Sequence, residues 1–275
     1  MSTPLTNPAP YTDVNDLLRE LLSSARAILG DHFVGMYLFG SLAAGDFDRH
    51  SDVDVLVVTD EDVSGDLLSS LHAMHARIAA AESPWATQLE VSYIPRPALR
   101  RFDPARALHP HIDRGAGQSL RVARHDADWV IQRHVLREKG LVLAGPEPRT
   151  LIDPLMPDDL RRAVSEVLRG WYAPMADDPA ALRSRGYQSY TVLTMCRMLY
   201  TLRHGAVVSK PFAARWARET LGARWAGLIE RAWEGRQTPQ TEAEPFDVSE
   251  TTAFIRHTLE LSRQFEPPGA DGAGS

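Results

Sequence analysis

The stretch from residue 38 to residue 58, LFGSLAAGDFDRHSDVDVLVV, constrains the fold more than any other part of the chain. Its residues 55–58 (VLVV) are apolar on both faces of an extended segment, a pattern typical of a central strand covered on both sides. Asp52 and Asp54 open this strand two residues apart, so they would project from the same face. The stretch therefore predicts a layered sheet whose central strand begins with two neighbouring carboxylates.

These carboxylates suggest a cation site next to a phosphate site. Two ionised carboxylates at close range repel each other unless a cation lies between them, and Mg²⁺ prefers such hard oxygen ligands. Gly40 and Ser41 follow an expected strand over residues 33–39. At a strand-to-helix turn, glycine lets the backbone approach a phosphate, and the serine offers a hydroxyl and N–H groups. The combination predicts a site for a nucleoside triphosphate.

Glu90 is the candidate for a third acid. It lies on the next expected strand, residues 89–94, as the polar exception between Leu89 and Val91 and on the same face as Ser92. Such a carboxylate can serve as a metal ligand, as the general base for an acceptor hydroxyl, or as both. The alternative is an ordinary solvated residue of an edge strand.

The pattern of the whole chain indicates an α+β fold in two domains. We expect a mixed β-sheet flanked by helices first, and an all-α domain after it. Residues 95–124 are rich in Pro, Arg, Gly and His without clean periodicity, so we expect loops and short elements that line a cleft. The expected boundaries are a flexible leader at 1–12, the sheet domain at 13–150, the helical domain at 151–265 and a flexible tail at 266–275. The helices expected after residue 126 are 127–139, 157–170, 186–204, 209–220, 224–234 and 248–265.

Composition limits the partners and the compartment. The net charge of −6 and pI near 5.9 argue against nucleic acid as a main partner, because phosphate backbones need a basic surface. Cys196 is the single cysteine, so no disulfide can form within one chain. The N-terminus lacks the features of a signal peptide, and no apolar run is long enough to span a bilayer. We expect a cytoplasmic monomer that binds small molecules and has no membrane partner.

Three stretches together resemble one known family. Gly40-Ser41 followed by Ser51-Asp52-Val53-Asp54 resembles the signature of the nucleotidyltransferase superfamily. The stretches VLTMCRMLY at 192–200 and VSKPFAARWA at 208–217 resemble the helical domain of the aminoglycoside 3″-adenylyltransferases, which modify streptomycin and spectinomycin. The similarity covers most of residues 30–235. It implies an enzyme that transfers AMP from Mg-ATP to a hydroxyl group, with a nucleotidyltransferase domain and a helical domain.

The resemblance also implies roles for particular residues. Asp52 and Asp54 would hold Mg²⁺, as two ions, and Glu90 would be the catalytic base and a further ligand. The residues implied in binding ATP are Gly40, Ser41, Ser51, Arg197 and Lys210, the last two reaching the triphosphate from the helical domain.

Two of these residues also attract attention in their own right. Lys210 is one of only two lysines in the chain and stands at an expected helix start, although an ordinary surface lysine is the alternative. Arg197 lies mid-helix between two methionines, and a buried arginine there needs an anionic partner, either phosphate or a structural carboxylate.

The acceptor is the least determined part of the prediction. The family carries a Trp in the linking region and acids before the helix of Arg197, whereas 95–124 holds no Trp and tyrosines precede that helix. The acceptor is expected to be an aminoglycoside-type antibiotic, which would give resistance. Another small molecule or a protein partner is the alternative acceptor, and a non-catalytic binding module would have no use for the three acids. The residues that we expect to contact the acceptor are Trp171, Asp177, Asp178, Tyr187 and Tyr190.

His109, His111 and Asp113 have a spacing that metal ligands also show. Without a nearby cysteine or a second histidine pair, we prefer a packing or substrate-lining role to a zinc site.

Overall fold

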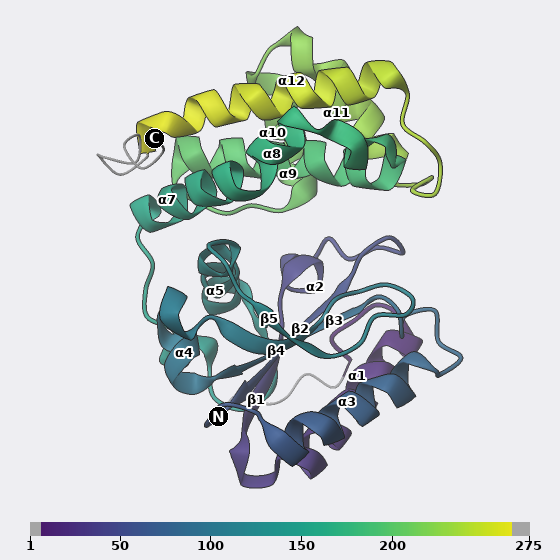
Figure 1. Cartoon of the computed structure of the whole chain (residues 1–275), viewed down its shortest axis with the longest axis vertical. Coiled ribbons are helices and arrows are strands. Elements are labelled where there is room, and N and C mark those ends of the chain that lie inside the picture. Colours follow the sequence, from purple (N-terminus) through teal and green to yellow (C-terminus); the bar gives the residue numbers. More distant parts are fainter. Residues whose placement is uncertain (1–6, 266–275) are drawn as a thin grey trace. The chain divides into compact units, whose positions relative to one another are not determined.

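The computed structural model describes residues 7–265, and the chain divides into two compact units between Pro154 and Leu155. The first unit is a mixed β-sheet flanked by helices, and the second is helical (Figure 1). The predicted fold class is therefore confirmed. Within residues 7–265, no helix is both long and apolar enough to cross a membrane.

A six-stranded sheet forms the centre of the first unit, with the strand order β5-β4-β3-β2-β1-β6. β2 and β3 run parallel, whereas each of the other neighbouring pairs is antiparallel. β2 lies inside the sheet, as its apolar run predicts, and it is joined to β3 by a helical crossover. The strands are β1 (Phe33–Leu38), β2 (Val53–Thr59), β3 (Leu89–Pro95), β4 (Leu108–Ile112), β5 (Arg121–Arg124) and β6 (Leu141–Ala144).

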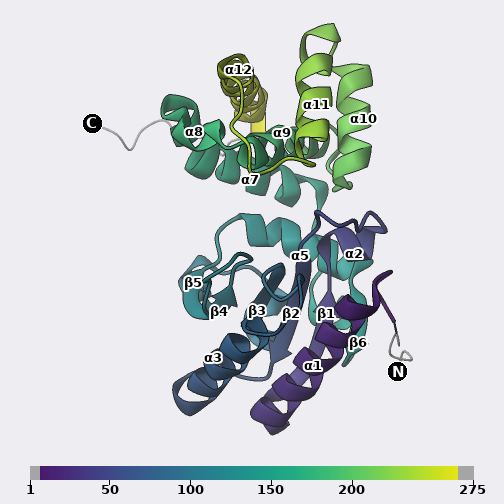
Figure 2. The same ribbon diagram turned by 90° about the vertical axis from the view of Figure 1, so that its right-hand side faces the viewer.

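Two long helices of the first unit, α1 (Thr12–Leu29) and α3 (Gly65–Ala79), lie side by side (Figure 2). Leu17 and Leu21 of α1 and Leu71 of α3 are buried in one apolar cluster with residues of the sheet, because their helical spacing places them on one face. The other helical elements are α2 (Gly40–Ala44), α4 (Arg96–Arg100), α5 (Asp128–Lys139) and α6 (Pro148–Leu151), with the 3₁₀ turns η1 (Gly30–His32) and η2 (Pro104–Arg106).

The part of the expected leader that the structure describes is held against the first unit. Ala9 is buried, and its backbone exchanges two hydrogen bonds of 3.0 and 2.9 Å with the Asn15 side chain. The ring of Tyr11 stacks on Trp85 with 5.4 Å between the ring centroids. Residues 1–6 and the expected tail at 266–275 lie outside the described residues.

Residues 95–124 form short elements joined by loops, as expected. Two of these elements, β4 and β5, pair as an antiparallel hairpin at one edge of the sheet, and the sequence did not identify them as strands. Their residues gave a misleading signal, because β4 places a proline, Pro110, between His109 and His111. Both histidines are buried, so polar side chains occupy the positions where a strand normally shows apolar residues.

The second unit packs its helices around α9 (Arg185–His204), which contacts α7, α10, α11 and α12. Residues on every side of α9 are buried, in keeping with this central place. The expected helices of this domain are confirmed with small shifts of their ends. The remaining elements are α7 (Pro157–Val167), the π-helical turn η3 (Leu168–Tyr172), α8 (Ala173–Asp177), η4 (Pro179–Arg183), α10 (Lys210–Thr220), α11 (Ala223–Gly235), α12 (Pro245–Ser262) and η5 (Arg263–Phe265).

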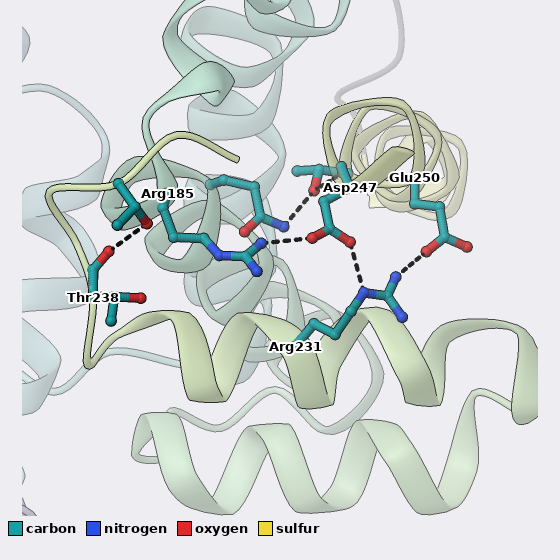
Figure 3. A network of polar contacts seen from close by, with 8 residues as sticks. Arg185, Arg231, Thr238, Asp247 and Glu250 are labelled. Atoms are coloured by element: carbon teal, nitrogen blue, oxygen red, sulfur yellow. Dashed lines mark hydrogen bonds and ion pairs between the residues drawn. The ribbon is translucent and has the colours of Figure 1, made fainter. Parts of the chain in front are cut away.

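A buried carboxylate ties three helices of the second unit together. Asp247 of α12 is 2% exposed and lies between two guanidinium groups (Figure 3). It accepts hydrogen bonds of 2.5 Å from Arg185 of α9 and 2.6 Å from Arg231 of α11, and Arg231 also pairs with Glu250. A buried charge with partners on both oxygens is stable only while both partners remain. This network therefore fixes α9, α11 and α12 relative to one another.

Candidate functional site

The three predicted acids lie together in the first unit. Asp54 on β2 and Glu90 on β3 are direct partners in the parallel register, and Asp52 stands immediately before β2. Each offers a carboxylate oxygen, and these three oxygens all lie within 4.8 Å of one another. All three side chains are partly buried. The two strands therefore assemble a cluster that no short segment of the sequence contains.

Gly40 allows the turn after β1 to approach this cluster. Its φ of +61° is unfavourable for residues with a side chain, and a Cβ atom there would lie 1.8 Å from Oδ2 of Asp54. The preceding residue, Phe39, donates its backbone N–H to the Asp54 carbonyl oxygen over 3.2 Å. The glycine is therefore needed for contact between the turn and the carboxylate.

The two predicted phosphate-binding serines differ in their surroundings. In the described part of the chain, the buried Oγ of Ser41 has no hydrogen-bond partner, so this hydroxyl is available to a ligand. The hydroxyl of Ser51 donates to Asp48 Oδ1 over 3.1 Å and accepts the Asp48 N–H over 2.9 Å. Ser51 thus stabilises the turn before Asp52, and contact of either serine with phosphate stays a prediction.

The electrostatics of the cluster fit a divalent cation. Burial raises the pKa of Glu90 from 4.5 to about 8, with further contributions from the charges of Asp54 and Asp52, while Arg114 acts in the opposite direction. The close carboxylates thus resist full ionisation when no cation is present. Three carboxylate oxygens at this spacing match the ligand type that Mg²⁺ prefers.

Arg114 is a residue of this site that sequence reasoning missed. It lies in the loop between β4 and β5, and its guanidinium pairs with the carboxylate of Asp52, 62 residues away in the chain. Only the pairing of β3 with β4 brings this loop to the acids, and no local pattern in the sequence signals it.

The histidines near β4 pack inside the first unit. His111 hydrogen-bonds Ser92 at 2.7 Å and Asp113 at 3.0 Å. His109 and His125 are buried, with 5.0 Å between their ring centroids, and burial lowers the pKa of His109 to about 4 and that of His125 to about 2. Within residues 7–265, the three acids are the only group of three potential ligands close enough to share a metal ion. The burial of His109 and His111 is compatible with a packing role, and the choice between packing and lining a substrate stays a prediction.

The predicted cationic residues belong to the second unit. Arg197 lies on α9, and its Nε is buried without a hydrogen-bond partner among the described residues. Lys210 is the first residue of α10, and its Nζ lies 5.3 Å from the centroid of the Tyr190 ring. Tyr190 in turn stacks on Tyr187 at 6.0 Å between centroids.

The predicted acceptor residues are largely exposed. The exposed fractions of Trp171, Tyr187 and Tyr190 are 52%, 40% and 37%. Asp178 accepts the N–H of Ala180 over 3.3 Å and so caps η4, whereas Asp177 ends α8 on the surface. The structure thus assigns a local capping role to Asp178, and the contact of all these residues with an acceptor stays a prediction.

Two family models match the chain, one in each unit. A nucleotidyltransferase domain matches residues 18–109, which include the three acids. The C-terminal domain of aminoglycoside adenylyltransferase matches residues 150–260.

Curated relatives extend over nearly the whole chain. A spectinomycin 9-adenylyltransferase of Staphylococcus aureus is 27% identical and covers 88% of this chain and 94% of its own length. An aminoglycoside (3″) (9) adenylyltransferase of Escherichia coli is 26% identical over 90% of this chain and 95% of its own.

The fold also has a counterpart among solved structures. The crystal structure of a spectinomycin adenyltransferase from Enterococcus faecialis, with ATP and spectinomycin, aligns with a TM-score of 0.68. The alignment covers 90% of this chain and 98% of that chain at 17% sequence identity, so this similarity supports the fold alone.

Proposed function

Because the chain belongs to the aminoglycoside adenylyltransferase family of nucleotidyltransferases, we propose that it transfers AMP from Mg-ATP to a hydroxyl group of an aminoglycoside-type antibiotic. The observation that carries this proposal is the cluster of Asp52, Asp54 and Glu90 on two parallel strands beside the Gly40 turn. Such a cluster supplies both a cation site and a base, and transfer of AMP requires both.

In this proposal the ligands of the divalent cations are Asp52, Asp54 and Glu90, and the proposed number of Mg²⁺ ions is two. When bound there, such a cation would neutralise charge on the triphosphate and would favour the ionised form of the Glu90 carboxyl. Gly40 keeps the turn close to the phosphates, and the Ser41 hydroxyl donates to a phosphate oxygen.

Glu90 then acts as the base. The acceptor hydroxyl oxygen attacks the α-phosphorus of ATP while its proton passes to the Glu90 carboxylate. A bond forms between the acceptor oxygen and the α-phosphorus, and the bond from that phosphorus to the bridging oxygen of the β-phosphate breaks. Pyrophosphate leaves with the electron pair of that bond, and the acceptor carries AMP as a phosphodiester.

Arg197 and Lys210 bind the triphosphate in this proposal. A buried Nε of Arg197 without a partner in the described residues supports an anionic ligand for this side chain. Lys210 adds a compact positive charge at the start of α10. We assign Trp171, Asp177, Asp178, Tyr187 and Tyr190 to the acceptor, where exposed aromatic rings offer flat apolar faces and the acids attract ammonium groups.

The test is direct observation of the product. Purified protein is incubated with Mg-ATP and each member of a panel that includes spectinomycin and streptomycin, and mass spectrometry detects addition of one AMP group. We expect an adduct with at least one of these drugs. We also expect Asp54→Asn to lower the rate by roughly 100-fold or more, the loss typical of a damaged metal site. Asp60→Asn, at an exposed residue paired with Arg96, is the matched control.

Absence of an adduct with every drug of the panel would rule out the aminoglycoside acceptor. AMP found on a co-purified protein in the same experiment would favour the protein acceptor instead. Full activity of Asp54→Asn would refute the metal site.

A further inference from the structure

The loop between β4 and β5 places a positive side chain against the acids. Arg114 pairs through its guanidinium with Asp52, and the two side chains are 43% and 19% exposed. An ion pair between side chains of this exposure generally contributes little to the stability of the fold, and an exposed arginine can pair with any acidic group nearby. The question is therefore whether the structure fixes Arg114 at this place.

The backbone of the loop is tied to the segment that leads into β3. The N–H of Gly115 donates to the carbonyl oxygen of Thr87 over 2.7 Å, and Thr87 stands three residues before Glu90. Gly115 has a φ of +124°, a conformation that residues with a side chain rarely adopt. The residue after Arg114 is thus a glycine that joins the arginine to the strand carrying Glu90.

The other side of the loop is fixed through side chains. Nε2 of His111 lies 3.0 Å from Oδ1 of Asp113 and forms a hydrogen bond with it. The second ring nitrogen of His111, Nδ1, forms a hydrogen bond of 2.7 Å with the Ser92 hydroxyl. Ser92 and His111 are 2% and 8% exposed, and Ser92 follows Glu90 by two residues on β3. A buried chain of contacts therefore runs from β3 to the residue directly before Arg114.

Anchors on both sides distinguish Arg114 from a mobile surface arginine. Its guanidinium pairs with the Asp52 carboxylate, and a cation bound at the acids would use the same carboxylate, so the two would compete for it. A planar guanidinium also pairs well with phosphate oxygens, often through two hydrogen bonds at once. One side chain thus has two possible anionic partners at this site, a carboxylate of the protein and a phosphate of the substrate.

We propose that Arg114 is an internal counter-ion of the transfer site, which competes with the divalent cation for Asp52 and moves to the phosphates when nucleotide binds. This inference rests on the proposed function, because it requires a cation and a triphosphate at the acids. It follows that the free protein binds a bare cation weakly. Cation and nucleotide then favour each other's binding, since the phosphates relieve Asp52 of the guanidinium.

Two binding measurements on the full chain test this proposal without any turnover. The first is the affinity of the nucleotide-free protein for Mn²⁺, from the electron paramagnetic resonance signal of free Mn²⁺. The second is the affinity for α,β-methylene-ATP in EDTA, by calorimetry. In Arg114→Gln, we expect Mn²⁺ to bind about tenfold more tightly and the metal-free nucleotide about tenfold more weakly, each a change of 1.4 kcal/mol.

Two further variants separate a local role from general charge. Arg124→Gln removes the same charge at the far end of β5, where Arg124 pairs with Asp126, and both affinities should stay within about twofold of the wild type. Arg114→Lys keeps the positive charge, so its Mn²⁺ affinity should stay near that of the wild type. Equal changes in Arg114→Gln and Arg124→Gln would overturn the proposal, as would Arg114→Lys behaving like Arg114→Gln.

The outcomes also separate this inference from the proposed function. If the wild type and Arg114→Gln bind Mn²⁺ equally tightly, the metal site stands and the role of Arg114 is refuted. If neither binds Mn²⁺ at any concentration tested, both the metal site and the inference fail. Circular dichroism of each variant verifies that the fold is intact.

Discussion

Replacing Glu90 by glutamine should stabilise the first unit in the absence of metal, and increasingly so as the pH rises. The Glu90 pKa is raised from 4.5 to about 8, chiefly by burial and then by the charges of Asp54 and Asp52. A raised carboxyl pKa means that the unfolded chain releases its proton at lower pH than the folded one does. Stability is therefore lost as the pH climbs from 4.5 towards 8, and is unaffected by this group below 4.5.

The size of the effect follows from the two pKa values. Each pH unit between them costs about 1.4 kcal/mol, so at pH 7.5 the carboxyl group of Glu90 destabilises the folded first unit by about 4 kcal/mol. Glutamine has the same shape without the titration. The difference in unfolding free energy between Glu90→Gln and wild type should therefore be near zero at pH 4.5 and reach about 4 kcal/mol at pH 7.5.

Hydrogen exchange suits this measurement, because it follows one unit of a two-unit chain. Peptides that span β2 and β3 report the opening free energy of the strands that carry the acids. The experiment is done in EDTA between pH 4.5 and 8 with wild type, Glu90→Gln and Glu82→Gln. Glu82 is exposed, and its variant is the matched control, which should follow the wild type at every pH.

Parallel curves for wild type and Glu90→Gln would refute the reasoning, because they would mean that Glu90 titrates as it does in the unfolded chain. Saturating Mg²⁺ gives a second check. It should raise the stability of the wild type and have a much smaller effect on Glu90→Gln, since the cation binds the ionised cluster.

Three further predictions concern other residues. Gly40→Ala should weaken Mn²⁺ binding about tenfold or more, because the added Cβ would lie 1.8 Å from Asp54 Oδ2. Gly45 also has a positive φ, +76°, but open space around it, so the control variant Gly45→Ala should bind Mn²⁺ like the wild type. Equal Mn²⁺ affinities of the two variants would contradict the argument. Asp247→Asn should lower the unfolding free energy of the second unit by about 3 kcal/mol in urea denaturation, since it removes the buried carboxylate that both Arg185 and Arg231 contact and leaves Arg231 with Glu250 alone. A loss below about 0.5 kcal/mol would count against the network. His125→Phe should make the first unit less sensitive to acid. The lowered pKa of this histidine means that stability is lost as the pH falls below 6.5, by about 3 kcal/mol at pH 4.5, and an acid-unfolding curve equal to that of the wild type would contradict this.

The sequence predicts the first unit best where its signals are local. Residues 55–58 are apolar on both faces and do form an interior strand, and Asp52 and Asp54 share a face because alternation fixes it. These acids lie close to Glu90 because β2 and β3 pair in parallel. A helical pattern between two strand patterns predicts such a parallel pairing.

Strands are not identified from the sequence where their buried residues are polar or where they are very short. β4 carries two histidines and a proline at buried positions, so a hydrophobicity scale does not identify it as a buried strand. β6, at residues 141–144, is too short for its periodicity to be distinguished from a loop. Arg114 escapes notice for a different reason, since its partner Asp52 is 62 residues away in the chain.

The position of the six strands along the chain has a consequence for synthesis on the ribosome. Every strand of the sheet, from β1 to β6, precedes Pro154, and so do the acids, the Gly40 turn and the loop of Arg114. N-terminal units of multidomain proteins generally fold first as the chain emerges. The carboxylate cluster can therefore be complete while the helical unit is still being translated, and a nascent chain arrested after the first unit should already take up Mn²⁺.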